Sequence, residues 1–246
     1  MKTFVRYLPL LILAVTWETA SRLQLVSSLA LPPLSEVAAA WWDLLKSGEL
    51  VTNGAASLWR AGAGLFLSIV IGGALGIFMA WWRPVNIVLG PLVEALYPMP
   101  KSALIPVTVI WLGFGDGSKI LLILLGCMLP VTIGAYNGAR GSDQALVWTA
   151  RSMGASKLRM LWDVVLPSAT PELLNGIRTA LALSFILLVS SELIVAREGL
   201  GYLIGSLGSN GNYDAMYAVV LTVAFIGFAA DRVYQIFQDR MLRWQQ

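Results

Sequence analysis

The sequence contains no histidine and only one cysteine, Cys127, among its 246 residues. Histidine is the commonest metal ligand and the usual proton-transfer group near neutral pH, and a lone cysteine forms no disulfide within its own chain. No acidic cluster has the spacing of a metal site, and the GxxxxGK[ST] phosphate-binding loop is absent. These absences argue against an enzyme, a cofactor and ATP hydrolysis by that route in this chain. Cys127 lies inside an apolar run, where a packing role is expected.

Charged residues are also scarce. They make up 13% of the chain, against 57% hydrophobic residues and a mean hydropathy of +0.73, whereas soluble domains carry about 25% charged residues. The composition indicates an integral membrane protein, and the lack of a period-2 barrel pattern leaves helices as the spanning structure. With about 20 apolar residues needed for each span, we expect an all-α membrane protein with one transmembrane domain over residues 1–246. Six spans fit, at residues 8–22, 62–82, 87–111, 119–137, 173–195 and 213–237.

The basic residues set the expected orientation. Cytoplasmic termini place ten of them inside: Lys2, Arg6, Arg83, Arg140, Arg151, Lys157, Arg159, Arg232, Arg240 and Arg243. Five then lie outside: Arg22, Lys46, Arg60, Lys119 and Arg197. The net charge of +3 therefore reflects membrane topology and gives no support to a nucleic-acid partner. The start of the chain also fits a secretory signal, but Trp17 and Glu18 stand where small residues would precede a cleavage site.

A charged amphipathic stretch between Trp148 and Pro167 interrupts the apolar runs, inside a cytoplasmic loop expected over residues 138–170. Its apolar residues recur every three to five positions, as in short helices on a membrane face. Gly154 permits a tight turn, so two short helices meeting at this residue are expected. Pro167 and Pro171 are expected to end the stretch and start the next span. The plain alternative is a basic loop that only orients the protein.

This stretch resembles the EAA motif of ATP-binding-cassette (ABC) importer permeases. The shared features are the small pair Thr149-Ala150, Gly154 four residues after Ala150, and Leu166-Pro167 at the end. In that family the loop couples the membrane domain to a separate ATPase. The resemblance implies that docking involves the following residues: Ala150, Arg151, Met153, Gly154, Ala155, Ser156, Lys157, Leu166 and Pro167. Trp148 stands in place of the family's glutamate, so no contact of that acid carries over.

Small residues recur every four positions in the second expected span: Gly64, Ser68, Gly72, Gly76 and Ala80. This spacing predicts a seam along which another helix packs closely, and a structural role is favoured over a ligand site.

The third expected span carries Pro91, Pro98, Pro100 and Pro106, so this helix must be kinked or broken. Lys101 has two interpretations: a side chain that reaches toward the helix break, or a charge on an anion pathway. The segment from Pro98 to Gly115 resembles the nitrate, sulfonate and taurine branch of the importer permeases.

The fifth expected span contains four polar residues: Ser184, Ser190, Ser191 and Glu192. Acids inside a membrane usually face the interior of a helix bundle. For Glu192 a structural hydrogen bond or a pair with Arg197 is favoured over a place on the pathway. The Gly-Leu-Gly-Tyr-Leu-Ile segment that begins at Gly199 again resembles the nitrate, sulfonate and taurine permeases.

Together the resemblance implies the type I ABC importer permease (MetI-like) fold, working as a homodimer in the bacterial inner membrane. The implied partners are a second copy of the chain, two ABC ATPase subunits that bind ATP and Mg²⁺, a periplasmic or lipid-anchored substrate-binding protein, and membrane lipids. The solute is expected to be a small anion such as a sulfonate, taurine or nitrate. Lys101, Ser184, Ser190, Ser191 and Glu192 are the candidate pathway residues. The alternatives are a secondary transporter or channel that needs no ATPase, and a structural membrane anchor.

Overall fold

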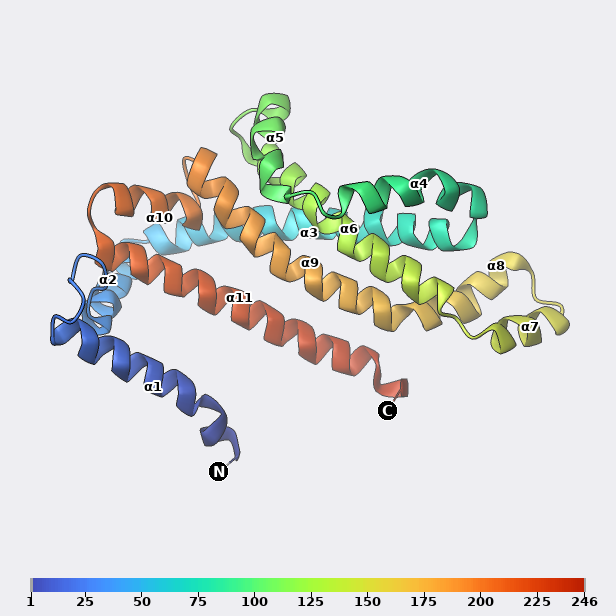
Figure 1. Cartoon of the computed structure of the whole chain (residues 1–246), viewed down its shortest axis with the longest axis horizontal. Helices are drawn as coiled ribbons and strands as arrows, with labels where there is room; N and C mark the ends of the chain where they lie inside the picture. The colour runs from blue at the N-terminus through green and yellow to red at the C-terminus, as the bar shows by residue number, and fades with distance from the viewer. Residues whose placement is uncertain (1, 246) are drawn as a thin grey trace. The chain divides into compact units, whose positions relative to one another are not determined.

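The computed structural model describes the backbone of residues 2–245 and the side chains of residues 8–244, and every element in it is a helix or a helical turn (Figure 1). The side chains of Lys2 and Arg6, which enter the charge count, lie outside the described residues. The helices are α1 (Lys2–Arg22), α2 (Leu34–Lys46), α3 (Glu49–Trp81), α4 (Arg83–Leu96), α5 (Ile105–Leu112), α6 (Asp116–Arg140), α7 (Gln144–Ser152), α8 (Lys157–Met160), α9 (Leu166–Val195), α10 (Leu200–Ser209) and α11 (Tyr213–Met241). Shorter turns are the 3₁₀ segments η1 (Lys101–Leu104) and η3 (Arg243–Gln245), and the π turn η2 (Leu161–Val165).

Four helical segments among residues 2–245 are long and apolar enough to cross a membrane: α3, α6, α8 through α9, and α11. A fifth crossing arises if α4 and the segment Lys101–Leu112 count together, and these two are bent by 99°. The predicted break in this region is therefore confirmed. It falls at Pro98 and Pro100, whose missing N–H groups cannot continue the helical hydrogen bonds. The helix α1, where the first of six spans is expected, is not among the five within the described residues.

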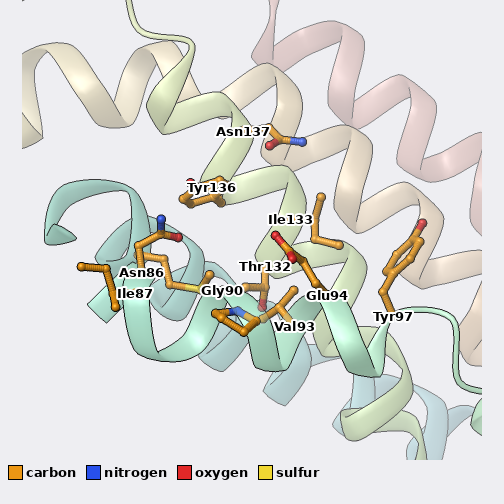
Figure 2. A pocket seen from close by; sticks show the side chains of 12 residues that line it. Asn86, Ile87, Gly90, Val93, Glu94, Tyr97, Thr132, Ile133, Tyr136 and Asn137 are labelled. Atoms are coloured by element: carbon orange, nitrogen blue, oxygen red, sulfur yellow. The ribbon is translucent and has the colours of Figure 1, made fainter. Parts of the chain in front are cut away.

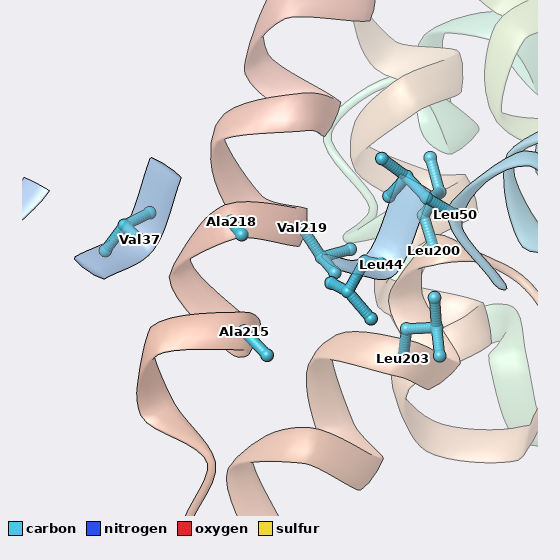
Figure 3. Packing of buried hydrophobic residues seen from close by; sticks show 8 residues of the cluster. All are labelled: Val37, Leu44, Leu50, Leu200, Leu203, Ala215, Ala218 and Val219. Carbon is cyan, nitrogen blue, oxygen red and sulfur yellow. The ribbon is translucent and has the colours of Figure 1, made fainter. Parts of the chain in front are cut away.

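The chain divides into two compact units, each with its own packing. One consists of the chain up to Ser57 together with Glu192–Ile226. Its buried apolar residues come from α2, the start of α3, α10 and α11, as Figure 3 shows: Val37, Leu44, Leu50, Leu200, Leu203, Ala215, Ala218 and Val219. The amphipathic helix α2 thus contributes Val37 and Leu44 from its apolar face.

The other unit contains Leu58–Ser191 and the chain from Gly227 onward, and α3 packs against α6 along the predicted small-residue seam. A side chain at Gly72 would meet the carbonyl oxygen of Met128 at 2.7 Å, and one at Gly76 would strike the backbone of Thr132. Ser68, between them, is fully buried and bonds the carbonyl of Gly64 at 2.7 Å. The structural interpretation of the seam is confirmed, because only small residues allow these two helices to approach so closely.

The same unit holds a second close helix crossing, between α6 and α9. A side chain at Gly134 would meet the carbonyl of Glu172 at 2.6 Å, and one at Gly176 would meet the carbonyl of Pro130 at 2.6 Å. Nearby, Cys127 is fully buried and its thiol lies 3.2 Å from the carbonyl of Ala180. Cys127 therefore has the packing role that its place in the sequence predicts.

Candidate functional site

Two short helices meet at Gly154, as the sequence predicts. The first, α7, ends at Ser152, and the backbone then turns through Gly154, whose φ is +82°. Two hydrogen bonds close the turn: the N–H of Ala155 donates to the carbonyl of Ala150 (3.0 Å), and the N–H of Gly154 donates to the carbonyl of Arg151 (3.0 Å). These are the six-residue and four-residue closures of a Schellman motif, which needs a left-handed residue where Gly154 lies. The spacing of Ala150 and Gly154 is therefore that of a helix end.

Side-chain caps define the other ends of these two helices. Asp143 begins α7, because its Oδ1 accepts the N–H of Ala145 at 2.8 Å. Ser156 begins α8, because its Oγ accepts the N–H of Arg159 at 3.3 Å. Each cap satisfies a backbone donor that the helix leaves free. The knuckle, by which we mean residues 150–157, is thus built from local hydrogen bonds and one glycine conformation.

Pro167 lies in the first turn of α9, as expected for the start of a span, but the expectation that Pro167 and Pro171 end the preceding segment is wrong. Helix continues without interruption from Lys157 to Val195 and passes both prolines. The π turn at Leu161–Val165 lies just before Pro167, and within it the N–H of Leu166 bonds the carbonyl of Leu161, five residues earlier. A wider turn relieves the crowding that proline causes in the preceding turn of a regular helix. As a result α8 is the first turn of a long rod that includes α9.

The knuckle exposes the residues predicted to dock. Met153 is 82% exposed, the highest value at this site. The other predicted docking residues are exposed or half-buried in the chain: Ala150, Arg151, Gly154, Ala155, Ser156, Lys157, Leu166 and Pro167. Apolar neighbours Leu146, Trp148, Leu158 and Trp162 are also more than half exposed. Figure 1 shows α7 and α8 projecting beyond the end of α6. An exposed apolar surface with basic residues around it is typical of a protein interface.

The opposite side of the segment is anchored. Val165 and Ala169 pack with Ala139 of α6 in a buried cluster, and Trp81 of α3 and Leu161 pack against it. Met160 is buried as well. One side of the helical rod is therefore fixed to α3 and α6, while the knuckle at its tip remains accessible.

Several of these features were not found from the sequence. The cap at Asp143 had a usable signal, because an aspartate precedes the amphipathic run. The π turn and the buried anchor had none, since both depend on how the segment meets α3 and α6. Trp148, which replaces the family's acid, is 66% exposed.

Glu192 is fully buried at the N-terminal end of α10. Its carboxylate oxygens lie 2.7 and 2.9 Å from the hydroxyl of Ser57, and the N–H of Gly201 donates to Oε2 at 3.0 Å. A side chain at Gly199 would strike the same carboxyl group. These bonds give Glu192 the structural hydrogen-bonding role that the sequence favoured over a place on the pathway.

The first backbone donors of α10 are satisfied by side chains of α3. Asn53 Oδ1 accepts the N–H of Gly199 at 2.7 Å, and Ser57 Oγ accepts the N–H of Leu200 at 2.8 Å. Together with Glu192 from α9, three side chains therefore hold the start of α10. We call these three side chains, Asn53, Ser57 and Glu192, the Glu192 cradle. They explain the glycine at position 199, where any side chain would strike the Glu192 carboxyl group.

The serines predicted to line the pathway have local partners. The hydroxyl of Ser184 donates to the carbonyl of Leu181 (2.7 Å), and that of Ser191 donates to the carbonyl of Leu188 (2.8 Å). Both side chains are about 1% exposed, whereas Ser190 is half-buried. Ser184 and Ser191 therefore face the interior of the single chain, and their role in a pathway stays a prediction.

Lys101 lies at the break between α4 and η1. Its ammonium donates to the carbonyls of Leu96 (2.7 Å), Tyr97 (3.0 Å) and Met99 (2.8 Å). A lysine ammonium has three donors, so these three carbonyls occupy all of them. Of the two interpretations, the geometry favours a side chain that satisfies the broken end of a helix.

Arg60 and Lys119, counted from the sequence as outer charges, are buried to 2% exposure. The Nε of Arg60 donates to Oδ1 of Asp116 at 2.7 Å, and the ammonium of Lys119 donates to the carbonyls of Phe114 and Gly115. Both cations thus hold the turn between α5 and α6. Their burial arises from packing and has no signal in the local sequence.

Comparison with known proteins identifies the family. The family of binding-protein-dependent transport system inner membrane components matches residues 72–243, which include the knuckle, α9 and Glu192. The chain belongs to this family. The permease is 36% identical to the taurine transport system permease protein TauC of Escherichia coli (strain K12), over 96% of the chain and 87% of that protein. It is 32% identical to a protein named as an aliphatic sulfonates transport permease, SsuC of Bacillus subtilis (strain 168), over 97% of the chain and 86% of that protein.

Solved structures show the same fold. A chain from the MetNI methionine ABC transporter in inward facing conformations matches the permease with a TM-score of 0.67 and 21% identity, over 82% of this chain and 98% of that one. The permease therefore has the all-helical MetI-like fold, with four to five apolar helices among the residues described. It is the membrane subunit of an ABC importer, and ATP hydrolysis belongs to a separate subunit of such systems. Among the described residues, no group of three potential ligands is placed to hold a metal ion.

Proposed function

We propose that this permease imports a small sulfonate across the bacterial inner membrane, as a homodimer driven by two ABC ATPase subunits. The single observation that carries the coupling part is the knuckle: an exposed apolar tip, with Met153 82% exposed, on a rod anchored to α3 and α6. The likeness to TauC and SsuC over most of the chain supports sulfonates, including taurine, over nitrate as the solute.

In this proposal each knuckle enters a groove on one ATPase subunit, which binds ATP and Mg²⁺. Closure of the two ATPases on ATP brings the knuckles together. Because helix is continuous from Lys157 to Val195, movement of the tip turns α9 as one body. That rotation changes the dimer between inward-facing and outward-facing states.

The solute passes between the two copies after delivery by a periplasmic or lipid-anchored binding protein, which supplies much of the specificity. Both termini lie in the cytoplasm, α1 forms the sixth span, and lipids surround the bundle. Ser190 is the pathway candidate on α9 that the single chain leaves half-buried. Lys101, Ser184, Ser191 and Glu192 border the pathway as structural supports.

The test is to purify the tagged permease gently from native membranes, identify what accompanies it, and measure ATP hydrolysis and ATP-driven sulfonate uptake in vesicles. The informative variant is Gly154→Val, with Gly48→Val as its matched control. Both glycines have positive φ, +82° and +80°, and a side chain at either meets nothing within 4 Å. The two variants therefore impose the same backbone strain, at the knuckle in one case and between α2 and α3 in the other.

We expect an ATPase subunit to accompany the wild type and the Gly48 variant, and to be lost or uncoupled from uptake in the Gly154 variant. A chain that purifies alone and transports sulfonate in vesicles without ATP would refute the proposal in favour of a secondary transporter. Equal uptake by both variants would refute the docking role of the knuckle.

A further inference from the structure

A cavity of about 500 Å³ lies between α4 and α6, at the end of α6 that leads into the knuckle. Figure 2 shows the residues that line it. Its volume falls within the range of roughly 300–1,000 Å³ that is typical of small-molecule sites. Six of its lining residues are polar: Asn86, Glu94, Tyr97, Thr132, Tyr136 and Asn137.

Glu94 is the only charged residue that lines this cavity, within the part of the chain that the structure describes. Figure 2 shows its carboxylate on α4, directed toward α6. The side chain is exposed, and no hydrogen bond or ion pair within residues 8–244 engages it. A carboxylate in a recess whose other lining side chains are all neutral can bind a cation.

A cation-binding group is unexpected in a permease for a simple anion. A carboxylate repels a sulfonate at close range. Lys101, which donates to the carbonyl of the lining residue Tyr97, has all three donors engaged by backbone carbonyls. A solute that carries an ammonium group as well as the sulfonate removes the conflict.

Groups at the edge of the cavity can bind the sulfonate end of such a solute. Tyr136 lines the cavity, and its hydroxyl accepts a hydrogen bond from Nη1 of Arg140 at 2.8 Å. The guanidinium also lies over the Tyr136 ring, 5.6 Å from its centre. The amide groups of Asn86 and Asn137 add neutral donors. The cavity therefore has a carboxylate within it and a cation at its margin.

We propose that this cavity is a solute site for a zwitterion, in which Glu94 binds the ammonium of an aminoalkanesulfonate and the sulfonate lies toward Arg140. The proposal rests on the importer function above and narrows its solute class. It places a second selection step in the permease, after the binding protein, because a sulfonate without the amine meets the Glu94 carboxylate unpaired.

The test measures binding directly, without ATPase turnover or the binding protein, so that its result is independent of transport. The full-length permease, with any subunits that accompany it, is placed in lipid nanodiscs. Binding of taurine and of ethanesulfonate, which lacks the amine, is measured by equilibrium dialysis with labelled compounds. The variants are Glu94→Gln and the control Glu36→Gln, which removes an exposed carboxylate of α2 outside the cavity.

We expect the wild type to bind taurine more tightly than ethanesulfonate. Glu94→Gln should lower the affinity for taurine about tenfold or more, as expected for the loss of a hydrogen bond to a charged group. The same variant should bind ethanesulfonate no more weakly, and Glu36→Gln should match the wild type. Equal affinity of the wild type for both sulfonates, no binding of either, or an unchanged preference in Glu94→Gln would each overturn the proposal. None of these results would overturn the importer function, which depends on the ATPase and on uptake.

Discussion

The N–H of Ala155 bonds the carbonyl of Ala150 across Gly154, with a donor–acceptor distance of 3.0 Å. This bond explains why a glycine follows four positions after residue 150 in the segment. The alanine closes a helix, and the glycine supplies the left-handed backbone that lets the chain fold back over the helix end. The motif is thus a structural device that presents the residues next to it, Met153 above all.

The effect of substitutions at Gly154 should depend on how well each residue adopts left-handed backbone, and not on the size of its side chain. A Cβ at this position meets no atom within 4 Å, so strain at φ +82° is the only cost. Asparagine tolerates this region, alanine loses roughly 1–2 kcal/mol, and valine loses more. We therefore expect coupled ATP hydrolysis to decline in the order Gly, Asn, Ala, Val. An order that follows side-chain volume would contradict this explanation.

Met153→Asp should weaken association with the ATPase and leave the permease folded. Met153 is 82% exposed, so a charge there costs little in the free chain but is costly once buried in an apolar groove. The measurement is the amount of ATPase that accompanies the variant, with thermal stability in detergent as the check on folding. Met153→Leu, which keeps apolar volume, is the control and should behave as the wild type.

Glu192→Ala should destabilise the permease. The substitution leaves the Ser57 hydroxyl and the Gly201 N–H without their buried acceptor, at a cost of roughly 1–3 kcal/mol for each unsatisfied group. Thermal unfolding in detergent measures the loss. Because Ser57 and Glu192 share one network, the double variant with Ser57→Ala should lose less than the sum of the two single variants. Additive losses would show that the two side chains act independently.

Gly76→Ala should disrupt the contact between α3 and α6, whereas Gly62→Ala should not. A Cβ at Gly76 would strike the carbonyl of Thr132 and lie 2.6 Å from Cβ of Ala135, but a Cβ at Gly62 meets nothing within 4 Å. Overpacking of this kind typically costs about 1–3 kcal/mol. Since alanine favours helix over glycine, Gly62→Ala should be neutral or slightly stabilising. Melting temperatures of the two purified variants test the contrast, and equal values would refute the seam.

Arg178 and Asp231 should contribute a measurable coupling energy between α9 and α11. Their ion pair has two parallel contacts, Nε to Oδ1 at 2.8 Å and Nη2 to Oδ2 at 3.1 Å. Fork geometry of this kind is stronger than a single contact, and lysine cannot reproduce it. Because both side chains are partly exposed to solvent, a double-mutant cycle with Arg178→Ala and Asp231→Ala should give a coupling of about 0.2–1 kcal/mol in favour of the pair. Arg178→Lys should recover only part of this coupling energy, and zero coupling would show that the pair is incidental.

The sequence predicted several local features correctly. The turn at Gly154, the break at Pro98 and Pro100, the small-residue seam and the packing role of Cys127 all depend on single residues with strong backbone or size preferences. The stop expected at Pro167 was wrong because a π turn accommodates the proline. The same segment also packs on α6 through Val165 and Ala139, a contact that local sequence does not reveal.

Hydropathy and the residues Ala150, Gly154 and Gly199 by themselves determined that this chain is a helical membrane protein with tight turns at the two glycines. The reason is that the preference of apolar residues for the membrane and of glycine for left-handed backbone belongs to each residue and needs no distant partner. Only the tertiary structure decided the roles of the charged side chains. Glu192, Arg60 and Lys119 are buried with hydrogen-bond partners, while Glu94 remains open to a cavity. The free energy of a charge depends on which groups surround it, and those groups come from distant parts of the chain.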